Sequence, residues 1–286
     1  MLKNIRELGL EQQLTDLETN GLTVVPPDLA TSGQFVERLH SKVLQVAKTR
    51  SGIEPDVKYG RTHADIEKTA GQTGEMWLWR LLLEDPIFEK ELMNPVSLAL
   101  ITSLLGYSAK LSSSSAIIKG PVTIEGSPQV LNLHSDNRGI PAPFPKYAQV
   151  ANVTWALSDY TLENGCLGYV PRSHLLCRRP KQGEALNKVV PVEAEAGSLI
   201  VWHGNTWHDP FPRESAGLRV SMMFYFCREY LTTQERYEDE VPQDMFARNE
   251  QRFSTLMGLN DPYGWDASGP DMSRLQASCS GESLHA

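Results

Sequence analysis

The chain has 286 residues, of which 41% are hydrophobic, enough for an ordinary buried core. Lys and Arg number 27 against 35 Asp and Glu, a formal net charge of −8, and no basic run could follow a phosphate backbone. We therefore expect no nucleic-acid partner. The four cysteines form no CxxC pair of the kind that binds zinc, and their spread favours a reducing, cytoplasmic setting.

Neither of the two segments that could suggest a membrane fits that role. The N-terminal MLKNIRELGLEQQL is a charged, amphipathic helix start, not a basic segment followed by an apolar core, so it does not indicate a secretory signal. The most apolar stretch, PVSLALITSLLG, is too short and too interrupted by serine to cross a bilayer. We expect no membrane partner.

The first third of the chain is predicted to be mostly helical. Apolar residues recur at helical spacing from Leu2 to Leu17, Gly21 can end that helix, and LTVVPP then reads as a short strand. A second helix is predicted from about Ser32. Asp85 and Pro86 form an N-cap and first-turn pair that leads into IFEKELMNPVSLALITSLLG.

From about residue 110 to 230 the sequence predicts short strands without intervening helices. These runs are AKLSSSSAIIK, QVLNLHSD, AQVANVTWAL, CLGYVP, NKVVPVEA, GSLIVWHG and LRVSMMFYF. Such a series favours a mainly β fold with flanking helices, built on a double-stranded β-helix (jelly-roll, cupin-like) core. A helical pattern over QDMFARNEQRFSTLMG follows. Residues 1–265 are expected to form one domain, and 266–286 a loose tail.

The run LNLHSDNRG carries the first group of candidate metal ligands. If it is a strand, Asn132, His134 and Asp136 project to one face, so that an imidazole and a carboxylate converge. These are two of the three ligands of a facial triad, the two-histidine, one-carboxylate arrangement that leaves open positions on Fe(II). The His-x-Asp pattern alone is weak.

The segment VWHGNTWHDP offers two candidates for the third ligand, His203 and His208. The strand that follows, LRVSMMFYF, places Arg219 and Ser221 on one face and apolar residues on the other. An arginine inside a barrel needs an anionic partner, because an unpaired buried guanidinium is costly. A dicarboxylate co-substrate would provide that partner in a two-pronged grip.

These residues resemble the phytanoyl-CoA dioxygenase-like branch of the Fe(II)- and 2-oxoglutarate-dependent oxygenases. In that family the His-x-Asp pair is followed by a distal histidine and, eleven positions on, by an arginine, and here His208 and Arg219 are eleven apart. WALSDYTLENGCLGYVPRSH and ETNGLTVVPP also resemble family segments, so that the likeness covers roughly residues 17 to 230. The resemblance therefore selects His208 over His203.

The resemblance implies that His134, Asp136 and His208 bind Fe(II), that Arg219 binds 2-oxoglutarate, and that O2 is consumed. The implied reaction is oxidation, most simply hydroxylation, of a substrate C–H bond with release of succinate and CO2. Asp136 argues against halogenation, because related halogenases have a small residue there.

The sequence departs from the family at one co-substrate position. Pro210 stands where the family often has a serine or threonine, and Ser221 could substitute for it. By resemblance Thr154 is placed near the co-substrate, with Asn132 as a further candidate. Three polar residues beside the arginine are therefore predicted to assist in binding 2-oxoglutarate.

Two other functions compete with this interpretation. A cupin-like metal-binding or ligand-binding protein would lack oxygenase activity, but it would not need Arg219. A zinc hydrolase would need a general base, and no glutamate lies near either segment in the sequence.

The substrate is the least defined part of the function. The expected partner is a small molecule of secondary metabolism, since no basic cluster suits a CoA phosphate. Trp77 and Trp79 are read as core residues, although substrate-covering elements usually lie in this region of the fold. The C-terminal helix offers a surface for a homodimer.

Overall fold

The protein is described by a computed structural model that covers residues 2–60, 75–121, 131–259, 263, 265, 267–273 and 275. Most of the predicted tail from 266 onward, and the start of the predicted strand 129–136, lie outside these residues. Within the part of the chain so described, every helix is too short or too polar to cross a bilayer.

The N-terminal helices follow the predicted apolar spacing, with one interruption. The first predicted helix is divided into α1 (Leu2–Glu7) and α2 (Glu11–Asn20) at Gly9, whose φ of 67° belongs to the left-handed region. Helix α2 ends at Gly21, as predicted. The next helices are α3 (Pro27–Ala30) and α4 (Gly33–Ser51), the latter at the predicted position.

The helix predicted after Asp85 also forms as two pieces, α6 (Pro86–Leu92) and α7 (Pro95–Leu105). The Asp85 side chain caps α6 by accepting from the backbone N–H of Ile87, as expected. Asn94 caps α7 by accepting from the N–H groups of two following residues. Because Pro95 has no N–H and disfavours a helical residue before it, the break falls here.

Two antiparallel sheets make up the β region, and they confirm the predicted jelly-roll class. The larger sheet has the strand order β1-β7-β4-β9-β3-β2 and the smaller one β6-β5-β8. The strands are β1 (Leu22–Val25), β2 (Glu75–Trp79), β3 (Lys110–Lys119), β4 (Val150–Ala156), β5 (Leu167–Tyr169), β6 (Val190–Val192), β7 (Leu199–His203), β8 (His208–Pro210) and β9 (Arg219–Cys227). Short 3-10 helices span Leu81–Leu83, Ser173–Leu176 and Leu186–Lys188.

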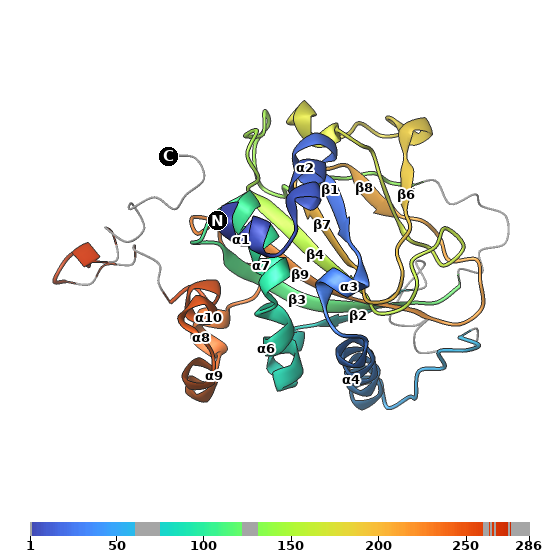
Figure 1. Cartoon of the computed structure of the whole chain (residues 1–286), viewed down its shortest axis with the longest axis horizontal. Coiled ribbons are helices and arrows are strands. Elements are labelled where there is room, and N and C mark those ends of the chain that lie inside the picture. The colour runs from blue at the N-terminus through green and yellow to red at the C-terminus, as the bar shows by residue number, and fades with distance from the viewer. Residues whose placement is uncertain are drawn as a thin grey trace.

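The large sheet separates an apolar core from a polar cavity. Helices α4, α6 and α7 lie along one side of this sheet, and β6 and β8 of the smaller sheet lie toward the other (Figure 1). The side that faces the helices is fully buried and apolar, with Trp155, Phe224 and Phe226 at its centre. Burial of these large rings supplies much of the hydrophobic driving force for folding.

In the β region and at the C-terminus, two predicted elements differ from the structure and one strand is new. Residues 131–133 are not part of a strand, and His134 makes only an isolated bridge with His208. The predicted C-terminal helix is divided into α9 (Gln243–Arg248) and α10 (Gln251–Leu256), preceded by α8 (Tyr237–Glu240). Asn249 interrupts it with extended backbone while its side-chain amide donates to Glu89. Strand β2 was not predicted.

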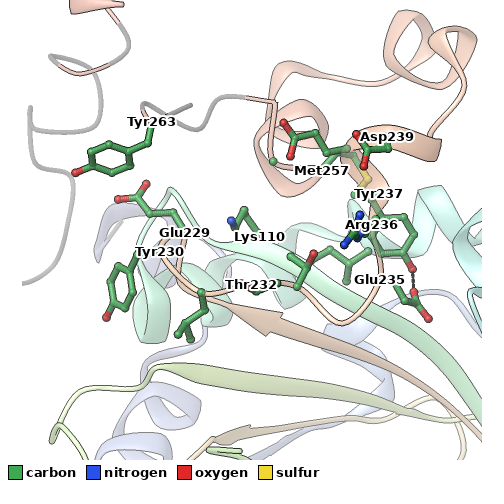
Figure 2. A pocket seen from close by; sticks show the side chains of 15 residues that line it. Lys110, Glu229, Tyr230, Thr232, Glu235, Arg236, Tyr237, Asp239, Met257 and Tyr263 are labelled. Carbon is green, nitrogen blue, oxygen red and sulfur yellow. Dashed lines mark hydrogen bonds between the residues drawn. The ribbon is translucent and has the colours of Figure 1, made fainter. Parts of the chain in front are cut away.

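A hollow of about 550 Å³ lies between the chain that follows β9 and helices α8 and α10 (Figure 2). Lys110, Glu229, Arg236 and Asp239 are among the residues that line it. It contains none of the predicted site residues. A separate cavity of about 490 Å³ lies between the two sheets and is lined by all of them except Asn132.

Candidate metal and co-substrate site

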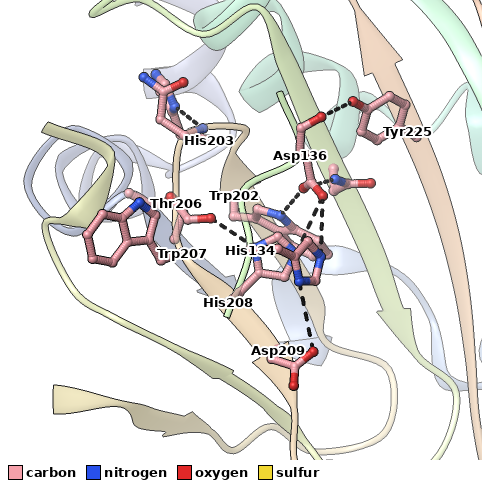
Figure 3. Close-up of polar contacts among 12 residues, drawn as sticks. His134, Asp136, Trp202, His203, Thr206, Trp207, His208, Asp209 and Tyr225 are labelled. Atoms are coloured by element: carbon pink, nitrogen blue, oxygen red, sulfur yellow. Dashed lines mark hydrogen bonds and ion pairs between the residues drawn. The ribbon is translucent and has the colours of Figure 1, made fainter. Parts of the chain in front are cut away.

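The structure brings together the three predicted metal ligands. One ligand atom from each of His134, Asp136 and His208 lies within 4.8 Å of the others. Nε2 of His208 is 3.6 Å, and Nε2 of His134 3.8 Å, from Oδ1 of Asp136 (Figure 3). Two imidazoles and a carboxylate on one side of a cavity are the donor set of a facial triad.

Backbone pairing holds the two histidines side by side. The N–H of His134 donates to the carbonyl of His208 at 3.1 Å, and the reverse bond is 3.0 Å. The N–H of Asp136 donates to the carbonyl of Gly204 at 3.0 Å. The loop that carries the His-x-Asp pair is thus attached to the β7–β8 turn, although residues 131–133 form no strand.

The ring nitrogens of His208 have separate functions. Nδ1 lies 2.9 Å from the carbonyl oxygen of Thr206, which can only accept, so this nitrogen carries the proton. When the ring is neutral, Nε2 therefore has a free lone pair, and this nitrogen faces Asp136. This is the orientation in which a buried imidazole binds a metal.

Two donors fix the carboxylate of Asp136. Its Oδ2 accepts from Nδ2 of Asn152 at 2.7 Å and from Nε1 of Trp202 at 2.9 Å. The hydroxyl of Tyr225 donates to the backbone carbonyl of the same aspartate at 2.9 Å. Oδ1 is thereby directed toward the two histidines.

The environment of His134 keeps this ring in its metal-binding form. Burial, followed by the charge of His208, lowers the pKa of His134 to about 4, so the ring is neutral at pH 7. Its Nδ1 lies 3.9 Å from Oδ1 of Asp209, whose Oδ2 accepts from the N–H of Asn132 at 2.9 Å. Burial raises the pKa of Asp209.

His203 is buried at the end of β7 and belongs to a different set of contacts. The N–H of Asn205 donates to its Nδ1 at 3.0 Å, and its ring lies 5.4 Å from that of His174. Burial, followed by the charge of His174, lowers the pKa of His203 to about 3. The group of mutually close candidate ligands contains His208 and not His203.

Arg219 is 2% exposed and lines the cavity that holds the triad. Its Nη1 donates to the carbonyl of Gly165, and its guanidinium carbon lies 4.5 Å from the ring centroid of Tyr160. Within the described residues its Nε has no hydrogen-bond partner. A buried guanidinium with unused donors fits an anionic ligand in this cavity.

The other predicted co-substrate residues divide into two groups. Ser221 and Thr154 are buried, line the cavity, and have hydroxyl groups without a partner among the described residues. Asn132 is exposed and is absent from the cavity lining, because the chain there departs from the strand that its predicted orientation assumed. Asn152, two residues before Thr154 on β4, instead contacts Asp136.

Strand pairing arranges the cavity floor in rows that cross the large sheet. One row is Glu75, Lys119 and Arg219, on β2, β3 and β9. Another row places Trp79, Ser115, Met223 and Thr154 side by side, and all four line the cavity. Residues remote in sequence therefore share one polar surface.

Strand β2 contributes lining residues that were not predicted from the sequence. Trp77 and Trp79, which were predicted to be core residues, line the cavity and are 36% and 49% exposed. Glu75 also lines it, but Nζ of Lys119 lies 3.0 Å from its Oε1. This engaged carboxylate is a poor general base for hydrolysis. The alternation of EMWLW could have indicated a strand with both indoles on one face.

The fold is shared with solved structures of other proteins. The epimerase SnoN of nogalamycin biosynthesis, solved with Fe3+ and α-ketoglutarate, has a TM-score of 0.58 at 19% identity, covering 83% of this chain and 91% of that one. HygX from Streptomyces hygroscopicus, solved with nickel and 2-oxoglutarate, has a TM-score of 0.58 at 16% identity, covering 78% and 88%. At these identities the matches define the class of fold.

Sequence comparison defines the family. The model of the phytanoyl-CoA dioxygenase (PhyH) family matches residues 17–221, and the chain belongs to that family. A relative named dioxygenase af480, from Aspergillus fumigatus, is 28% identical over 179 residues. This match spans 62% of the present chain and 56% of the relative's length.

Proposed function

We propose that this protein is a non-haem Fe(II)- and 2-oxoglutarate-dependent dioxygenase that oxidises a C–H bond of a small organic molecule. The observation that carries the proposal is the convergence of His134, Asp136 and His208 beside the buried Arg219 in one cavity. Family membership supports the same reaction class. Hydroxylation, with release of succinate and CO2, is the proposed outcome, in the cytoplasm and in secondary metabolism.

The residues present fit the proposed iron. Two imidazoles and one carboxylate suit Fe(II), and the triad leaves positions for a co-substrate and O2. Bound iron with 2-oxoglutarate supplies the oxidising power, which no side chain of the protein has. The hydrogen bonds from Asn152 and Trp202 to Asp136, and from His208 to Thr206, hold the ligands in place before metal binds.

The residues around Arg219 fit 2-oxoglutarate as co-substrate. The guanidinium is proposed to bind the carboxylate remote from the 2-oxo acid, which would give its unused Nε–H an acceptor. The hydroxyl groups of Ser221 and Thr154 are proposed to donate to the same molecule. Burial strengthens these contacts because little water competes for the donors.

Succinate formation tests this proposal. Purified protein with Fe(II), ascorbate and 2-oxoglutarate is expected to form succinate above a protein-free control. Asp136→Ala is expected to abolish the activity, because it removes a proposed ligand that a neighbouring side chain cannot replace. His203→Ala is expected to leave a measurable fraction, because His203 contacts loop residues and not the triad.

Two results would contradict the proposal. Equal loss in both variants would mean that the wrong histidine has been assigned. Absence of succinate from iron-loaded wild-type protein, even beside a broad panel of substrates, would favour a cupin-like binding protein. Calorimetric titration with Ni(II) then distinguishes a metal-binding cupin-like protein, which would still take up metal through His134 and His208, from a protein that binds no metal there. A sedimentation run on the same sample tests the proposed homodimer.

A further inference from the structure

Two tryptophans of β2 form an aromatic surface on the wall of the cavity. The rings of Trp77 and Trp79 are stacked, with centroids 4.7 Å apart and an interplanar angle of 11°. Exposure rises along the strand from 8% at Glu75 to 36% at Trp77 and 49% at Trp79. The strand thus runs from the buried interior of the cavity toward its mouth, and both indoles are partly exposed.

Polar contacts hold this surface in position. Nε1 of Trp77 donates to Oε2 of Glu75 at 3.3 Å. The carbonyl of Trp79 accepts from Nη1 of Arg50 at 2.7 Å, and the next N–H, of Arg80, donates to Oε1 of Glu235 at 3.0 Å. The indoles are therefore oriented by the strand and its anchors without being buried. Fixed, accessible aromatic faces on a cavity wall are typical of a ligand-binding surface.

The charges around the cavity indicate the charge of the ligand. Among the described lining residues, the acids are Glu75, Asp136 and Asp209, and the bases are Lys119, Arg138 and Arg219. The three negative and three positive charges balance. Fe(II) with doubly negative 2-oxoglutarate would preserve that balance. A charged substrate would enter the cavity without a surplus counter-charge, which is unfavourable in a partly dehydrated site.

The carboxylate next to the tryptophans is already engaged. Glu75 is paired with Lys119, which is 3% exposed, and it also accepts from Trp77. Cations often bind between an indole face and a free carboxylate. Because Glu75 is not free, the aromatic surface favours stacking of an uncharged ring over capture of a cation.

We propose that Trp77 and Trp79 bind the substrate by stacking against an uncharged, flat ring system. This inference rests on the proposed function for the chemistry that follows binding. Strand β2 lies three strands from β4, roughly 14 Å across the sheet at the usual strand spacing. Asn152 of β4 holds Asp136, so the stacked ring and the oxidised carbon belong to different parts of one substrate.

A charge series on one ring tests the proposal. The probes are 2-naphthalenemethanol, 2-naphthoate and 2-naphthylmethylammonium, and dissociation constants are measured by ligand-observed NMR on the full chain, both metal-free and loaded with Zn(II) and 2-oxoglutarate. The neutral probe is expected to bind about tenfold more tightly than either charged probe in both states. Trp77→Ala and Trp79→Ala are each expected to weaken its binding about tenfold.

The controls separate stacking from misfolding. Trp265→Ala removes an indole that is 56% exposed and does not line the cavity, and it is expected to leave the affinity unchanged. Trp77→Phe and Trp79→Phe keep a smaller ring and are expected to give intermediate affinities. Binding that is insensitive to both alanine substitutions, or tightest for a charged probe, would overturn the proposal.

Parallel measurement of succinate formation by the wild-type protein distinguishes this proposal from the proposed reaction. Succinate without binding of 2-naphthalenemethanol would overturn the aromatic surface alone. Binding that depends on the tryptophans, without succinate, would support the surface and contradict the oxygenase assignment.

Discussion

Neighbouring residues of strand β9 belong to two different environments. Arg219, Ser221, Met223 and Tyr225 face the cavity, whereas Val220, Met222, Phe224 and Phe226 are fully buried in the apolar core. Because side chains alternate along a strand, one nine-residue segment contributes to both the candidate site and the stability of the sheet. Substitutions one position apart on β9 should therefore affect different properties.

The largest expected effect is on the core face. Phe224→Ala is expected to lower the free energy of unfolding by about 3–5 kcal/mol, because it removes a fully buried ring and leaves a cavity. Urea unfolding followed by circular dichroism measures the change. Activity per folded molecule is expected to stay within about twofold of wild type; a larger loss would show that the two faces are not independent.

The matching substitution on the cavity face is Arg219→Ala. It is expected to raise the KM for 2-oxoglutarate about 100-fold or more, because a buried charge-assisted contact would be lost. Succinate formation at varied 2-oxoglutarate concentration measures this effect. Arg219→Lys keeps the charge without the two-pronged geometry, and its KM for 2-oxoglutarate should lie between those of the wild type and Arg219→Ala. An unchanged KM in both variants would exclude Arg219 from co-substrate binding.

A smaller effect is expected from the residue that holds the metal carboxylate. Asn152→Ala is expected to weaken Ni(II) binding about 10- to 100-fold, because Asp136 loses its hydrogen bond at 2.7 Å. Tyr225→Phe serves as the comparison, since Tyr225 contacts the backbone carbonyl of Asp136 and not its carboxylate. Calorimetric titration should rank the two variants in this order, and the reverse order would contradict the assignment.

Per pH unit, the smallest expected effect concerns an acid on the core side. Glu91 of α6 is fully buried, and burial raises its pKa well above the usual value, so the folded protein holds this proton more tightly than the unfolded chain. The resulting stability is complete below the unfolded pKa of Glu91 and is lost as pH rises toward its folded pKa. The loss reaches about 1.4 kcal/mol per pH unit.

Glu91→Gln should reduce this loss, because glutamine does not ionise. The free energy of unfolding measured at several pH values between 5 and 8, in steps of about one unit, checks the prediction. If the free energy of unfolding depends on pH in the same way in the wild-type protein and in the variant, the prediction is contradicted. The cavity-face variant Arg219→Ala is the control, and it should keep the wild-type slope.

The positions of the helices and strands, and the candidate ligands themselves, were predictable because they depend on local sequence patterns. Gly21, Asp85 and Pro86 act through their own backbone and nearest neighbours, and the structure confirms the helix end and helix start that they predict. The alternation of β9 likewise placed Arg219 and Ser221 on the cavity face. The selection of His208 depended on the family resemblance, since one histidine ends strand β7 and the other lies just after it.

Other features required the tertiary structure. The helix breaks at Gly9 and Asn94 reflect competition between a continuing helix and capping or left-handed backbone, which apolar spacing alone does not resolve. The role of β2 depended on its pairing with β3 at the sheet edge, which leaves Trp77 and Trp79 facing the cavity. Short segments pair according to partners that are distant in sequence.

The amino-acid sequence by itself determined which groups can bind a metal or an anion and which faces of the strands are apolar, because side-chain chemistry and strand alternation are local properties. Only the tertiary structure decided how those groups are oriented. Asp136 is held by Asn152 and Trp202, which lie 16 and 66 positions away along the chain. Such contacts form only when the sheet brings distant strands together, and chain folding therefore determines the geometry of the site.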